Sequence, residues 1–138
     1  MSQTLFIAGA TVRSVTQSAV RAGYRVVAAD LFGDRDLQVC AQIRQVDPFP
    51  EALPQIARQI EPCCWMYTGG LENSAELVNA VSQFHTLWGN GAEVLRQVRD
   101  PFAVGQSLTE AGFSSLRLSR RRPEPAANKV WLRKPIHS

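Results

Sequence analysis

Apolar segments of strand length alternate with helical segments along most of this chain. Residues 4–10, TLFIAGA, form a continuous apolar run, and residues 11–22 then carry their apolar side chains at helical spacing until Gly23. A second apolar run, YRVVAAD, follows at residues 24–30. Strands that are apolar without interruption are buried on both faces, so this opening predicts a parallel βαβ unit with a right-handed crossover.

The alternation continues as far as Gly112. Further strands are expected at residues 42–46, 63–70 and 85–90, and further helices at residues 34–41, 49–62, 73–84, 91–98 and 100–112. In the helix over 73–84, Leu77, Val81 and Phe84 form the predicted inner stripe. The whole pattern predicts a Rossmann-like, doubly wound α/β fold, with a mostly parallel five-stranded sheet and helices on both faces.

Length and composition are those of one globular domain, because 45% of the 138 residues are hydrophobic and 20% are charged. No apolar run approaches the roughly 18 residues of a membrane span, and the amino terminus lacks a secretory signal, so a cytoplasmic protein without membrane contact is expected. Cys40, Cys63 and Cys64 lack metal-ligand spacing and are predicted to be buried apolar residues in a reducing compartment.

Three loops are the expected ligand-binding positions. In an open parallel sheet, ligands bind at the carboxyl ends of the strands, where the strand order reverses. Those ends carry residues 9–14 after the first strand, residues 30–34 after the second and residues 68–73 after the fourth. The candidate site residues are therefore sought in these loops.

The first loop copies part of the dinucleotide-binding fingerprint. Gly9 opens a helix, and Asp30 follows about twenty residues later, at the spacing of the acid that binds a ribose hydroxyl. Thr11 and Ser14 stand where further glycines belong, and their side chains would crowd a pyrophosphate. A structural glycine turn is therefore favoured over a free-standing nucleotide-binding oxidoreductase. Thr11, Arg13 and Ser14 can still hold a small anionic substrate at the helix terminus.

The loop after the fourth strand, TGGLEN, supports two interpretations that are compatible with each other. In one, it forms a turn in which Asn73, or the Ser74 that follows, caps the next helix. In the other, Gly69 and Gly70 let a ligand approach the backbone while Glu72 accepts hydrogen bonds from it.

No other motif indicates catalysis. His85 and His137 lie far apart without a carboxylate pattern, and each is predicted to be a surface residue. No GxSxG nucleophile elbow is present, so hydrolase chemistry has no support. Arg120, Arg121 and Arg122 run into PEPAAN without interleaved aromatic residues, which favours a solvated hinge over a nucleic-acid-binding adaptor.

Taken in order, the motifs resemble the amino-terminal portion of an ATP-grasp ligase. FIAGATVRSVTQSAVRAGYRVVAAD resembles the first βαβ unit of that family, YTGGLEN its glycine and Glu-Asn loop, and LWGNGAEVLRQVRDPFAVGQSLTEAGF the passage into the grasp. The ending VWLRKPIHS resembles the strand whose lysine contacts the ATP phosphates, just before the glycine-rich phosphate loop. The resemblance covers nearly the whole chain.

The resemblance implies a pre-ATP-grasp domain over residues 1–112, a linker over 113–128 and the first strand of a truncated ATP-grasp domain over 129–138. Enzymes of this family use ATP and magnesium to activate a small-molecule carboxylate as an acyl phosphate. By resemblance, Lys134 contacts ATP, and the substrate lies against Thr11, Arg13, Gly69, Gly70, Glu72 and Asn73.

Departures from the family pattern limit what this chain is expected to do alone. It lacks the second lysine, the glycine-rich loop and the magnesium carboxylates, which implies an inactive fragment with no catalytic residue or metal ligand of its own. Such a fragment binds no cofactor tightly and needs the missing C-terminal ATP-grasp domain as a partner. Val130, Trp131 and Leu132 would leave an apolar strand edge, which predicts pairing with a second copy or with the domain itself.

Overall fold

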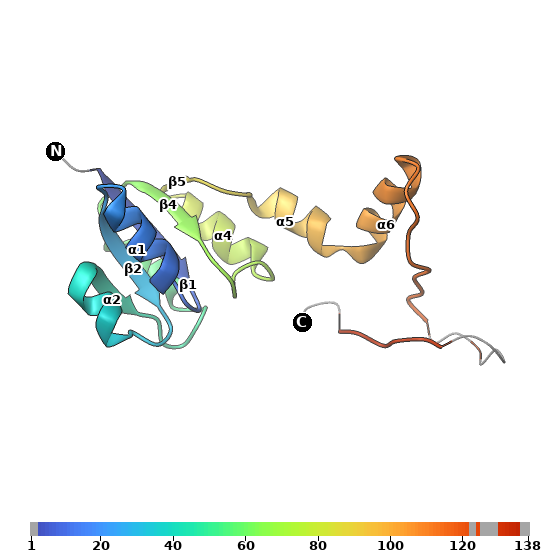
Figure 1. The fold of residues 1–138 in the computed structure, drawn as a ribbon, viewed down its shortest axis with the longest axis horizontal. Helices are drawn as coiled ribbons and strands as arrows, with labels where there is room; N and C mark the ends of the chain where they lie inside the picture. Colours follow the sequence, from blue (N-terminus) through green and yellow to red (C-terminus); the bar gives the residue numbers. More distant parts are fainter. Residues whose placement is uncertain (1–2, 122–123, 125–129, 136–138) are drawn as a thin grey trace.

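One parallel sheet organises the computed structural model, which describes residues 3–121, 124 and 130–135 (Figure 1). The strands are β1 (Thr4–Gly9), β2 (Arg25–Asp30), β3 (Gln42–Gln45), β4 (Cys64–Tyr67) and β5 (Thr86–Leu87). They lie in the order β3-β2-β1-β4-β5, and each neighbouring pair is parallel. The predicted Rossmann-like α/β class is therefore confirmed.

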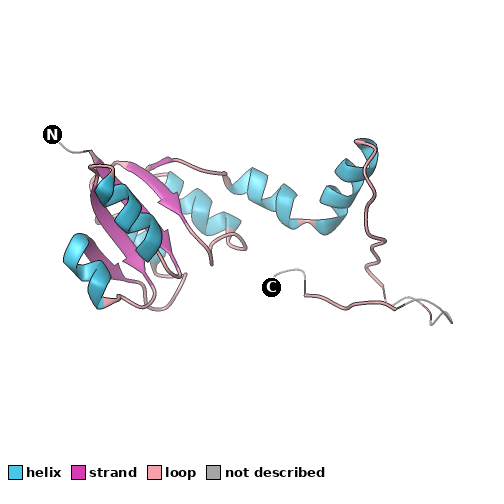
Figure 2. Cartoon of the chain, in the orientation of Figure 1, coloured by secondary structure: helices cyan, strands magenta, loops and turns pink. Residues whose placement is uncertain are grey.

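Helices cover both faces of the sheet (Figure 2). Within the described residues they are α1 (Arg13–Arg21), α2 (Arg35–Cys40), α3 (Leu53–Ala57), α4 (Ala75–Ser82), α5 (Ala92–Arg99) and α6 (Pro101–Glu110). Ala19 of α1 and Leu37 of α2 pack in one core cluster, whereas Leu53 of α3 and Val78 of α4 pack in the other. None of the described helices is long and apolar enough to cross a membrane.

The central strand β1 explains why the two faces are equally apolar. Its side chains alternate, so that Phe6 and Ala8 belong to the α3 and α4 cluster while Leu5 and Ile7 belong to the α1 and α2 cluster. All four are at most 3% exposed. Burial of the larger three contributes about 2 kcal/mol each, which is why an uninterrupted apolar run specifies this position in the sheet.

The predicted inner stripe of α4 needs correction. This helix buries Val78 and Val81, whereas Leu77 is half-buried and Phe84 is 36% exposed. The helix ends before Phe84, which therefore leaves the helical repeat, and the Arg58 guanidinium lies 5.1 Å from its ring centre.

The last two helices leave the sheet and extend away from it (Figure 1). α5 buries one residue, Leu95, and α6 buries none. The start of α6 agrees with the sequence, because the Asp100 carboxylate accepts a hydrogen bond from the Phe102 backbone N–H at 2.9 Å. Gly112 follows the helix with a φ of +81°, as its predicted stop requires.

Residues 113–121 run back along α6. The Phe113 N–H donates to the Leu108 carbonyl at 2.9 Å, and a Cβ on Gly105 would lie 3.3 Å from Leu118. Beyond the linker, residues 130–135 form no strand in this chain, and Arg117 lies 5.7 Å from the ring centre of Trp131. The assignment of residues 129–138 to the strand of a further domain stays a prediction.

Candidate functional site

The strand order reverses at the centre of the sheet, between β1 and β4. The chain passes from β1 to β2 and β3 on one side, and β4 and β5 fill the other side. The loops that follow β1 and β4, residues 10–12 and 68–74, therefore lie side by side at the carboxyl edge. This is the position at which open α/β sheets bind their ligands.

Hydrogen bonds join these two loops directly. The Ala10 N–H donates to the Gly69 carbonyl at 2.9 Å, and the Thr68 hydroxyl donates to the Thr11 carbonyl at 2.9 Å. A Cβ on Gly9 would lie 2.0 Å from the Thr68 hydroxyl oxygen and 3.3 Å from the Gly69 carbonyl oxygen. Gly9 is therefore required by the close approach of the two loops, as the prediction of a structural glycine turn implies.

Asp30, at the end of β2, holds the neighbouring turns in place. Its Oδ2 accepts from the Val12 N–H at 2.9 Å, and its Oδ1 accepts from the N–H groups of Phe32 and Gly33 at 2.9 and 2.7 Å. The residue is only 1% exposed. Both carboxylate oxygens serve the chain's own backbone, so Asp30 does not present them to a ribose, which argues against the dinucleotide-binding alternative.

The loop at residues 68–74, which is the predicted substrate loop, has a tightly specified backbone. Gly70 has a φ of +97°, and a Cβ there would lie 3.0 Å from the Ala10 Cβ and 3.1 Å from the Phe49 ring. The Gly70 N–H donates to Oε2 of Glu72 at 2.6 Å. Gly70 is needed for the turn, whereas Gly69 is exposed with no atom near its missing Cβ. Gly69 therefore leaves open space beside the backbone, which the second interpretation of this loop requires.

Tyr67, the last residue of β4, is a site residue that the sequence motifs did not reveal. Its hydroxyl donates to the Asn90 carbonyl at 2.7 Å. Burial raises the pKa of this phenol above its ordinary value of 10.0, and the negative charge of Glu72 raises it further. The signal in the sequence was only its place beside two glycines at a strand end.

We expect the alkaline titration of Tyr67 to report on Glu72. The E72Q variant should lower the pKa of Tyr67, because it removes the neighbouring negative charge but leaves burial unchanged. Ultraviolet absorbance of the phenolate measures this in a Tyr24→Phe background, since the chain has two tyrosines. Because the folded-state pKa is raised, this group contributes stability that is present below the unfolded pKa and is lost as the pH rises through the folded one. An unchanged titration in E72Q would contradict the proximity of these two side chains.

Asn73 does not cap α4, contrary to one interpretation of its loop. Ser74 holds the N-cap position without a side-chain cap bond, and Asn73 Oδ1 instead accepts from Arg99 Nε at 2.8 Å. Arg99 comes from the end of α5, 26 residues away in the sequence. It therefore belongs to the site although no motif singled it out.

Thr11 and Arg13 lie at the start of α1 and are exposed. The Arg13 guanidinium reaches Asp36 Oδ2 at 3.4 Å, and both side chains are about half exposed. Such a surface pair is weak, so Arg13 can exchange Asp36 for an anionic ligand at little energetic cost. Ser14 is also exposed, and the structure thus places all three predicted residues at one helix terminus.

Lys134 is not brought to these loops. It is exposed, and the segment 130–135 runs apart from the sheet (Figure 1). Arg120 is likewise used locally, since its guanidinium lies 4.3 Å from the Phe102 ring centre and 3.9 Å from an Asp100 oxygen. Arg122 lies outside the described residues, and the choice between a solvated hinge and a nucleic-acid surface stays a prediction.

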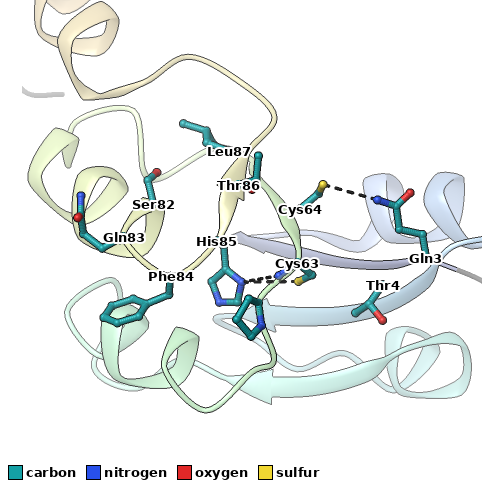
Figure 3. A pocket seen from close by; sticks show the side chains of 11 residues that line it. Gln3, Thr4, Cys63, Cys64, Ser82, Gln83, Phe84, His85, Thr86 and Leu87 are labelled. Atoms are coloured by element: carbon teal, nitrogen blue, oxygen red, sulfur yellow. Dashed lines mark hydrogen bonds between the residues drawn. The ribbon is translucent and has the colours of Figure 1, made fainter.

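A cavity lies at the opposite edge, at the amino ends of β1, β4 and β5 (Figure 3). It measures about 650 Å³, and its described lining includes Gln3, Cys63, Cys64 and Thr86 but no charged side chain. The candidate site is assigned to the carboxyl edge despite this cavity, because parallel α/β sheets bind ligands there and because the exposed polar residues of both central loops meet there.

His85 lines this cavity but is not the surface residue that the sequence predicts. It is 4% exposed, its Nε2 lies 2.9 Å from the Ala57 carbonyl oxygen, and its Nδ1 lies 3.3 Å from the Cys63 backbone nitrogen. A neutral ring that donates from Nε2 and accepts at Nδ1 satisfies both contacts. His85 is therefore a hydrogen-bonded core residue. His137 lies outside the described residues.

The cysteines are half-buried rather than fully buried, and all three are free thiols. Cys63 and Cys64 pack against opposite core clusters, as neighbours on a strand must. Burial raises the pKa of the Cys63 thiol, which favours its protonated, unreactive form.

No protein-family model matches the sequence, and no curated protein matches it. Solved structures do match the fold. N5-carboxyaminoimidazole synthetase from Staphylococcus aureus complexed with ADP aligns over 80% of this chain and 30% of its own, with a TM-score of 0.57 and 23% identity. An ADP complex of PurK, an N5-carboxyaminoimidazole ribonucleotide synthetase, aligns over 80% and 29%, with a TM-score of 0.61 and 19% identity.

A third match is a carboxylase. A single-chain, multi-domain long-chain acyl-CoA carboxylase aligns over 91% of this chain and 14% of its own, with a TM-score of 0.66 and 20% identity. The chain thus spans at most 30% of the length of these three structures. At such identities the likeness concerns the fold, and it confirms the resemblance at that level: this chain has the fold of the amino-terminal region of ATP-grasp ligases.

Proposed function

We propose that this chain is the substrate-side domain of an ATP-dependent carboxylate ligase. The observation that carries the proposal is the pair of loops that hydrogen-bond to each other where the strand order reverses, within a fold shared with ADP-bound synthetases. The substrate carboxylate would lie against Thr11 and Arg13 on one side and against the loop from Gly69 to Asn73 on the other. Activation of that carboxylate as an acyl phosphate would depend on ATP bound by a further domain.

Magnesium is assigned to that further domain. Within the described residues, no three His, Cys, Asp or Glu side chains gather where they could hold a metal ion. The nearest acid to the substrate loop, Glu72, is already bonded to the Gly70 N–H. The role we propose for this chain is to bind and orient the substrate, and the catalytic groups are assigned to the further domain.

Apolar side chains on α5, α6 and the segment after them support docking of the ATP-binding domain. The large exposed ones are Val94, Val98, Val104, Leu108, Phe113, Leu116 and Leu118. Large apolar side chains that are exposed on neighbouring elements often contact another part of a protein. Because the matched structures continue for more than twice the length of this fold, we assign this surface to the ATP-binding domain rather than to a second copy of this chain.

The isolated 138-residue chain is expected to bind MgATP only weakly. By resemblance, Lys134 is the residue of this chain that contacts the ATP phosphates, and it is exposed. One cation is only a small part of a phosphate-binding site. Titration calorimetry with MgATP should give no saturation below about 1 mM, and Lys134→Ala should not change the result. Micromolar binding by this chain would contradict the proposal and would favour a free-standing nucleotide-binding protein.

The proposal is tested by separating the two Michaelis constants of the native-length enzyme. ADP release is followed with bicarbonate and a panel of small carboxylic acids as candidate substrates. Asn73→Ala and Gly69→Val should raise the KM for the carboxylate about tenfold or more and leave the KM for ATP unchanged. Lys134→Ala should do the reverse. If the loop variants and Lys134→Ala changed the KM for the carboxylate and the KM for ATP equally, this division of labour would be rejected. Glu93→Gln, which is far from the loop in the sequence, is the control.

A further inference from the structure

A short polar connection links the substrate loop to the start of α6. Asn73 Oδ1 accepts from Arg99 Nε at 2.8 Å, and the next residue, Asp100, accepts from the Phe102 N–H at 2.9 Å. Arg120, on the segment that runs back along α6, lies 3.9 Å from the same carboxylate. Two adjacent residues at the end of α5 therefore contact the loop on one side and α6 on the other.

A separate contact attaches α5 to α4. Arg96 donates to Glu76 at 2.6 Å and to Glu93 at 3.1 Å, and the hydrogen bond with Glu76 is the main reason that the pKa of Arg96 is raised. This contact joins the first turn of α4 to α5 and involves no residue of the loop at residues 68–74. Arg99 and Arg96 are thus matched arginines on one helix: Arg99 bonds the loop residue Asn73, whereas Arg96 bonds Glu76 and Glu93.

The packing of α6 gives the Arg99 contact its importance. α6 buries none of its own residues, and α5 buries only Leu95, so the hydrophobic core does little to fix the position of α6. We infer that Arg99 is a positioning residue, which couples the conformation of the loop at residues 68–74 to the position of α6. This part of the inference rests on the proposed function: through the coupling, substrate bound in the loop would change the position of the domain that is docked on α6.

Hydrogen exchange of the chain alone tests the local contact without any ligand. R99A should speed exchange of the amides at residues 69–74 by roughly three- to tenfold, because the charge-assisted hydrogen bond to Asn73 is lost. Asn73→Ala should speed exchange of these amides by the same factor, and the double variant should speed it no more than either single variant. Arg99→Lys should speed it less than R99A. R96A should leave these amides unchanged. Amides of β1 are the internal reference, and an equal acceleration there would show global destabilisation and overturn the inference.

The coupling itself is tested by a substitution at the start of α6. Asp100→Ala removes the cap of α6 and should speed exchange in residues 69–74 when Arg99 is present, but not further in the R99A background. Independent, additive effects of the two substitutions would overturn the coupling. Because no substrate is used, this experiment can fail while the proposed function stands, and the KM experiment can fail while the coupling stands.

Discussion

Replacing Asp30 with alanine is expected to lower the free energy of unfolding by about 3–4 kcal/mol. In the native protein the buried carboxylate accepts hydrogen bonds from the N–H groups of Val12, Phe32 and Gly33. The substitution leaves these three N–H groups without their acceptor. Domains of this size are stable by about 5–15 kcal/mol, so the variant should stay folded but melt roughly 10–20 °C lower. Urea unfolding followed by tryptophan fluorescence measures the difference.

Asp34→Ala is the matched control for this experiment. Asp34 is the N-cap residue of α2, yet its side chain makes no cap hydrogen bond. Its replacement should change the free energy of unfolding by less than about 0.5 kcal/mol. If Asp30→Ala were as mild as Asp34→Ala, Asp30 would be free to serve a ligand, and the dinucleotide alternative would regain support.

Gly9→Ala is the second substitution with a large expected effect. The added methyl group would lie 2.0 Å from the Thr68 hydroxyl oxygen, 3.2 Å from the Thr68 Cβ and 3.3 Å from the Gly69 carbonyl oxygen. The two loops must separate, with loss of the Ala10 to Gly69 hydrogen bond. We expect a loss of about 3 kcal/mol, measured in the same unfolding experiment.

Two further variants locate the cause of that loss. Gly69→Ala adds a methyl group in the same pair of loops where nothing lies within 4 Å, and it should be nearly neutral for stability. Thr68→Ala combined with Gly9→Ala should lose less than the sum of the single effects, because it removes the closest clashing atom. A Gly9→Ala variant as stable as Gly69→Ala would disprove the close approach of β1 and β4.

Sequence patterns predicted the sheet well because burial on both faces leaves a strong signal. β1 and β2 form where the apolar runs predict strands, and both lie inside the sheet with a neighbour on each side. Helix lengths were less predictable. The helix expected over residues 49–62 is only α3, although its apolar residues, such as Leu53 and Ala57, still face the core. A short amphipathic turn and a full helix bury the same residue types, so periodicity does not separate them.

The site was predictable as a place but not as a set of contacts. Glycines and polar residues at strand ends indicated the loops after β1 and β4, and the structure joins those loops. Arg99 could not be found in this way, because its bond to Asn73 spans 26 residues and leaves no local pattern. The prediction that His85 lies on the surface was wrong for the same reason. The local sequence does not indicate that the Ala57 carbonyl accepts a hydrogen bond from this ring in the core.

The central claim, that this fold works as one domain of an ATP-dependent ligase, is tested most directly by the native gene product. The protein would be isolated from its own cells under non-denaturing conditions, and the intact masses of its chain and of any bound partner would be measured. We expect a chain much heavier than 15.3 kDa, or a stable complex with a second chain, that contains an ATP-binding domain. A lone 15.3 kDa chain without such a partner would contradict it.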